Sequence, residues 1–171
     1  MDNTIAAVSA VILLIGCCTG CGREKKVKLP KICFIYSERF GEKLAKHFCD
    51  CNGNYYNIIS DDIKLMNIDE LTANYGSGEL KDDIELICEY DKDELEEKYA
   101  KFVKAAKSGE CQMKVPDMMP DVEAPNRCWS GIYTAEDGTS VMVDIHEERR
   151  MTDIYSKNPD INEVYEWFSG K

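Results

Sequence analysis

The chain has 171 residues, of which 44% are hydrophobic, and carries a formal net charge of −11. The apolar fraction suffices for a folded core, and the residues beyond the N-terminal segment, about 140, have the size of one domain. A surface this acidic repels the phosphates of nucleic acids, which excludes a nucleic acid as the expected partner.

An uncharged and mostly apolar run at residues 5–16 lies close to the N-terminus. As a helix this run would reach only ~18 Å, whereas a membrane span needs about 20 residues. Its length is that of the apolar region of a signal peptide. We therefore expect residues 1–28 to be a signal or membrane-anchor segment with a tether, and residues 29–171 to form a single globular domain.

The run ends in Leu14-Ile15-Gly16-Cys17, where an apolar residue and a small residue precede a cysteine. This motif resembles the lipobox of bacterial lipoproteins, and the chain is similar in style to small uncharacterised lipoproteins of Gram-positive bacteria. The resemblance implies cleavage before Cys17, acylation of its thiol, and a lipid anchor on the extracytoplasmic face of the cell membrane. Cys21 is a second candidate for lipidation because it follows Thr19-Gly20.

The distribution of basic residues supports an alternative topology. The first four residues contain no lysine or arginine, and the positive charges at 23–28 follow the apolar run. The positive-inside rule then leaves the domain in the cytosol behind a single-pass anchor. In that topology the cysteines beside the membrane are candidates for palmitoylation, and the domain is a cytosol-facing adaptor.

The domain begins with a predicted strand. The apolar run at residues 31–36 contains β-branched and aromatic residues, which is typical of a buried strand. Phe40, Leu44 and Phe48 then recur at a spacing of four residues. This spacing predicts an amphipathic helix over 38–48.

The middle of the chain predicts two further strands and two helices. Residues 55–59 and 84–90 have the composition of strands, and a capping-box pair predicts a short helix that begins at Asn67. The most regular apolar spacing in the chain predicts a helix over 91–107, which Gly109 would end.

The last third predicts a loop, a hairpin and a helix. Prolines interrupt residues 109–126, so we expect an internal loop there. Apolar runs at 129–134 and 141–145 flank an Asp-Gly pair, which favours a β-hairpin. A third strand at 151–155 and a final helix beginning near Asp160 complete the predicted elements.

These elements predict an α+β fold, with a mostly antiparallel sheet covered by helices and a C-terminal hairpin and helix. The alternation of strand and helix in the first half leaves an α/β, flavodoxin-like sandwich as the alternative. The segment at residues 36–41 superficially resembles the opening of a flavodoxin. However, a flavin phosphate loop is rich in hydroxyls, and this segment carries Glu38 and Arg39. We therefore expect no cofactor.

The cysteines and histidines suggest two structural possibilities. His47, Cys49 and Cys51 form the densest set of possible metal ligands, although the second ligand pair of a structural zinc site is missing. Cys111 and Cys128 flank the proline-rich loop and are the preferred disulfide pair.

No established catalytic motif occurs in the sequence, and paired carboxylates such as Asp61-Asp62 are typical of a solvated surface. The expected function is therefore a membrane-anchored lipoprotein with a non-catalytic extracytoplasmic binding or protective domain, whose protein or small-ligand partner the sequence does not identify. The alternatives are the cytosol-facing palmitoylated adaptor and a membrane-tethered flavodoxin-like or metal-binding enzyme.

Overall fold

The computed structural model describes residues 27–111, 126–149 and 152–170. Nearly all of the predicted signal or anchor segment lies outside these residues, including the lipidation candidates Cys17 and Cys21. Most of the predicted loop at 109–126 also lies outside them.

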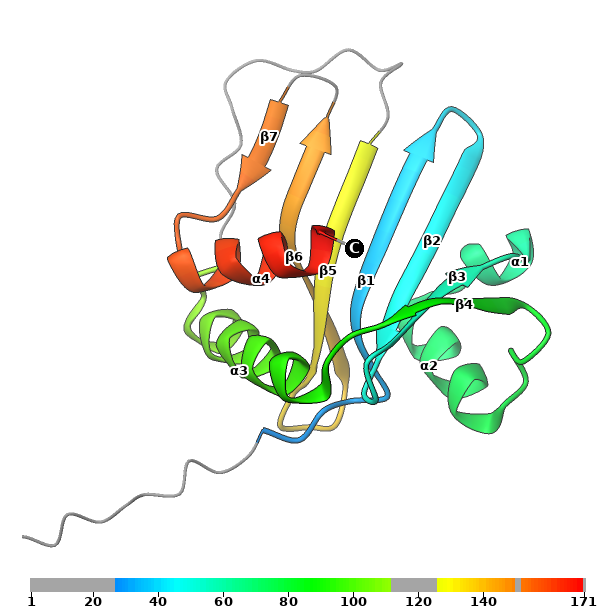
Figure 1. The fold of residues 1–171 in the computed structure, drawn as a ribbon, viewed down its shortest axis with the longest axis horizontal. Helices are drawn as coiled ribbons and strands as arrows, with labels where there is room; N and C mark the ends of the chain where they lie inside the picture. The colour runs from blue at the N-terminus through cyan, green and yellow to red at the C-terminus, as the bar shows by residue number, and fades with distance from the viewer. Residues whose placement is uncertain (1–26, 112–125, 150–151, 171) are drawn as a thin grey trace, which may run out of the picture.

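Seven strands of the described residues form one sheet in the order β4-β3-β2-β1-β5-β6-β7 (Figure 1). The strands are β1 (Ile32–Phe40), β2 (Lys43–Asp50), β3 (Asn54–Ile58), β4 (Ile84–Glu89), β5 (Asn126–Thr134), β6 (Ser140–Arg149) and β7 (Thr152–Tyr155). The described helices are α1 (Asp61–Lys64), α2 (Ile68–Ser77), α3 (Lys92–Ser108) and α4 (Pro159–Ser169).

Every neighbouring pair of strands in this sheet is antiparallel. Four successive strands, β1 to β4, lie side by side, as do β5 to β7, and the two groups meet where β1 pairs with β5. The predicted α+β class is therefore confirmed. The α/β alternative is wrong for the described residues, because the helices between strands do not connect parallel neighbours.

The helix predicted over 38–48 is also wrong. Strand β1 continues to Phe40, the chain turns at Gly41 with φ +58°, and β2 returns beside β1. A spacing of four residues is even, so it keeps side chains on one face of a strand as well as on one face of a helix. Phe48 is buried by this arrangement, whereas Phe40 is 57% exposed near the turn.

Local signals elsewhere predicted the element ends well. Asn67 and Glu70 form the expected capping box, with the Glu70 backbone N–H donating to the Asn67 side chain at 3.0 Å. Gly109 ends α3 in the left-handed conformation, with φ +74°. The predicted hairpin is formed by β5 and β6, and its turn contains Gly138 at φ +88°.

The two faces of the sheet carry separate cores. Helices α3 and α4 cover one face, where Phe34, Phe102 and Phe168 are buried together (Figure 1). Helix α2 covers the other face, where Leu71 packs in a cluster with Phe48. The end of the sheet between α2 and α3, at the bottom of Figure 1, adjoins a cavity.

Candidate functional site

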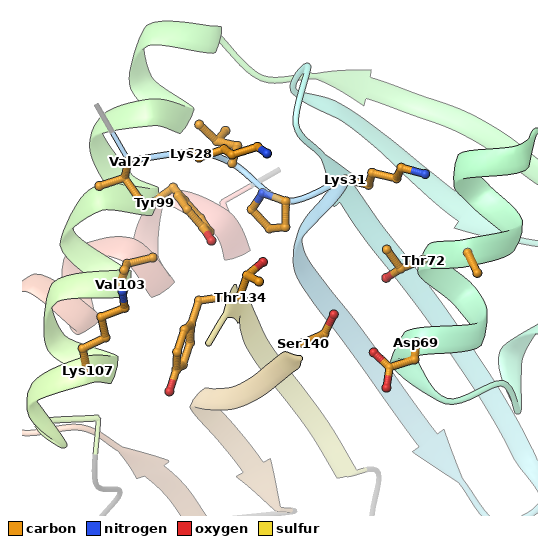
Figure 2. A pocket seen from close by; sticks show the side chains of 14 residues that line it. Val27, Lys28, Lys31, Asp69, Thr72, Tyr99, Val103, Lys107, Thr134 and Ser140 are labelled. Carbon is orange, nitrogen blue, oxygen red and sulfur yellow. The ribbon is translucent and has the colours of Figure 1, made fainter. Parts of the chain in front are cut away.

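A cavity of about 680 Å³ lies at the end of the sheet where the described chain begins (Figure 2). Helix α3 forms one side and α2 the other, and the turn end of the β5–β6 hairpin lies between them. Residues 27–31 run across the cavity before they enter β1. Four segments that are distant in the sequence therefore meet around one space.

The α3 side of the cavity is an apolar wall. Tyr99 and Val103, one turn apart on α3, are buried, and Tyr133 of β5 is half-buried beside them. The Tyr99 hydroxyl donates a hydrogen bond of 3.0 Å to the carbonyl of Ile132, which holds the ring in place. Burial raises the pKa of Tyr99 well above its usual range, so the hydroxyl stays protonated and neutral.

Three lysines, Lys28, Lys31 and Lys107, border the cavity, whereas its lining contains a single carboxylate, that of Asp69. None of the three lysine side chains forms a hydrogen bond or ion pair with another described residue. A Cβ placed on Gly76 would overlap the Lys31 side chain, so this lysine lies against the C-terminal part of α2, at the border of the cavity. Lys28 and Lys107 are exposed.

The α2 side of the cavity is polar. The hydroxyls of Thr72 and Ser140 and the Asp69 carboxylate project from α2 and from the start of β6 (Figure 2). Together with the lysines and the apolar wall, these groups can bind and orient a small molecule that has both polar and apolar parts.

The predicted metal ligands lie elsewhere, on β2 and in the turn after it. The His47 ring lies 5.4 Å from the ring of Tyr36 and 5.6 Å from that of Tyr55, centroid to centroid. Cys49 is fully buried, and burial raises the pKa of its thiol well above the usual range. The described residues hold no group of three or more histidine, cysteine or acidic side chains placed to bind a metal ion.

All six cysteines in the described residues are free thiols. Burial raises the pKa of the Cys111 thiol to about 11 and that of the Cys128 thiol to about 12. The predicted Cys111–Cys128 disulfide is not formed in this structure, and the pairing stays a prediction.

The pairing of strands also assembles an aromatic row that sequence reasoning missed. Directly opposed residues place His47, Tyr36, Trp129 and His146 side by side across β2, β1, β5 and β6. The ring of Tyr165 on α4 stacks on His146 with the centroids 3.7 Å apart. Both histidines of the chain therefore belong to one layer, which packs in part beneath α4.

A charged row borders this aromatic layer two residues further along the strands. Arg127 of β5 forms ion pairs with Glu38 at 3.0 Å and with Glu148 at 3.3 Å. The hydroxyls of Tyr36 and Tyr165 donate to the same two carboxylates. These side chains satisfy one another, so the row stabilises the layer and leaves the cavity as the stronger candidate for ligand binding.

Comparisons with protein-family models, with curated proteins and with solved structures found no match for this chain. Among the helices of the described residues, none is both long enough and apolar enough to cross a bilayer.

Proposed function

We propose that the chain is a membrane-anchored lipoprotein whose domain binds a small ligand, without catalysis, on the extracytoplasmic face of the cell membrane. The cavity beside residues 27–31 is the observation that carries this proposal. Its volume of about 680 Å³ is within the range of small-molecule sites, and it combines an apolar wall with a few polar groups.

The position of the cavity fits an anchored binding domain. Lys28 and Lys31 belong to the first described segment, which contains the last two residues of the expected anchor and tether and the start of the domain. An anchor attached there would hold the cavity close to the bilayer surface. Ligands that partition to that surface would then be concentrated at the site.

Mass spectrometry of the native full-length protein tests the anchor. We expect loss of residues 1–16 and a diacylglyceryl group on Cys17, with Cys17→Ser blocking the modification and Cys21→Ser leaving it in place. An intact Met1 together with acyl groups on the cysteines would contradict the lipoprotein and support the cytosol-facing adaptor.

Equilibrium dialysis tests the cavity. The probe is 1-naphthaleneacetamide, a neutral aromatic molecule, and the full-length chain is held in non-ionic detergent with protein-free detergent as the blank. Ala73 is exposed on α2 and lines the cavity, so Ala73→Trp should fill the entrance without disturbing the core. We expect this variant to weaken retention of the probe about tenfold. No retention, or equal retention by the variant, would contradict a ligand site in the cavity.

A further inference from the structure

The charge around the cavity is opposite to the charge of the chain. The whole chain carries −11, yet the cavity has three lysines against one carboxylate. Acidic residues outnumber basic ones by 32 to 21 in the chain, so a lining drawn at random would be acidic on average. This local excess of positive charge favours an anion inside a molecule that repels anions elsewhere.

From this reversal we infer that the cavity binds a small organic anion, with a carboxylate or phosphate group attached to an aromatic or aliphatic body. This inference rests on the proposed function and specifies its ligand. The anionic group would be attracted by Lys28 and Lys107, which border the cavity from two different segments. The body of the ligand would pack on the half-buried ring of Tyr133 and on Val103, which line the α3 side.

The absence of ion pairs between Lys28 or Lys107 and other described residues supports an anionic ligand in the cavity. Lys98 and Lys101, which also lie on α3, both contact the Glu163 carboxylate of α4. Lys28 and Lys107 have no carboxylate partner among the described residues, so an incoming anion need not displace one. Ligand binding then gains the attraction of both ammonium groups, which solvent screens in part because both lysines are exposed.

A matched pair of probes tests the charge of the ligand. 1-Naphthaleneacetate carries a carboxylate where 1-naphthaleneacetamide carries a neutral amide, and the aromatic body is the same. We expect the full-length chain to retain the carboxylate about tenfold more tightly than the amide, and the difference to shrink as salt increases. Lys28→Gln combined with Lys107→Gln should remove this preference, so that the carboxylate and the amide are retained equally.

Lys81→Gln combined with Lys104→Gln is the control, because both lysines are exposed outside the cavity and the net charge changes equally. This control should keep the preference for the carboxylate. If both probes bind equally and Ala73→Trp weakens both, the cavity binds ligands but the inferred anion is wrong. If Ala73→Trp has no effect on either probe, the proposed function itself is wrong.

Discussion

The His47 side chain shows how its environment determines the protonation of a single residue. Its ring lies between those of Tyr36 and Tyr55, and its Nδ1 atom is buried without a hydrogen-bond partner. Burial lowers the pKa of His47, and nearby Glu38 offsets this effect only in part. The folded state therefore favours the neutral imidazole.

The stability of the protein should consequently depend on pH through His47. The unfolded chain binds a proton on this histidine below about pH 6.5, whereas the folded chain resists protonation until the pH is lower. The free energy of unfolding should thus fall as the pH is lowered from 7.5 to 5.5. His47→Phe keeps an aromatic ring between the tyrosines and should reduce this fall, as measured by urea unfolding at the two pH values. An unchanged pH dependence in the variant would show that His47 does not contribute.

Helix α4 illustrates how one element is held by two kinds of contact. Its apolar face buries Ile161, Val164 and Phe168 against the sheet. On its other side Glu163 contacts Lys98 and Lys101 of α3, and these contacts lower the pKa of Glu163 to about 2. The carboxylate is exposed, so solvent weakens its ion pairs, whereas burial of the apolar face is not screened.

We expect the apolar contacts of α4 to dominate its attachment. Phe168 is 3% exposed and contacts the rings of Phe34 and Tyr55. Phe168→Ala should lower the free energy of unfolding by about 3–4 kcal/mol. Glu163→Gln, on the same helix, should have a clearly smaller effect in the same urea titration. Equal effects of the two variants would show that the ion pairs hold the helix as strongly as the core does.

At the scale of the whole molecule, the central strands connect the two cores. Phe34 faces the core under α3 and α4, while its neighbour Ile35 faces the core under α2. Because one backbone supports both faces, loss of either core removes support from the other. The described residues should therefore unfold as one cooperative unit.

A substitution in one core should accordingly be detected from the other. Leu71 of α2 is fully buried, and Leu71→Ala should destabilise the protein by about 3 kcal/mol. Trp129 and Trp167 report on the opposite face, where they pack in or against the α3–α4 core. In Leu71→Ala, the urea unfolding transitions followed by tryptophan fluorescence and by far-ultraviolet circular dichroism should have the same midpoint. This midpoint should be lower than that of the wild type. A fluorescence transition that stays at the wild-type midpoint would contradict coupling of the two cores.

Some features follow from short stretches of sequence because their causes are local. The cap at Asn67, the end of α3 at Gly109 and the turn at Gly138 depend on hydrogen bonds and backbone angles within about four residues. The buried start of β1 follows from a continuous apolar run for a similar reason. Local signals failed at 38–48, where the spacing of Phe40, Leu44 and Phe48 fits a helix and a strand alike.

The sequence by itself thus determined the acidic charge, the caps and turns, most elements and the α+β class. Only the tertiary structure decided that β1 pairs with β5, which places Tyr36 beside Trp129 and both histidines in one row. It also decided that Lys28 and Lys107 border one cavity. The physical reason is that pairing between distant strands depends on burial of both sheet faces at once, which no local pattern specifies.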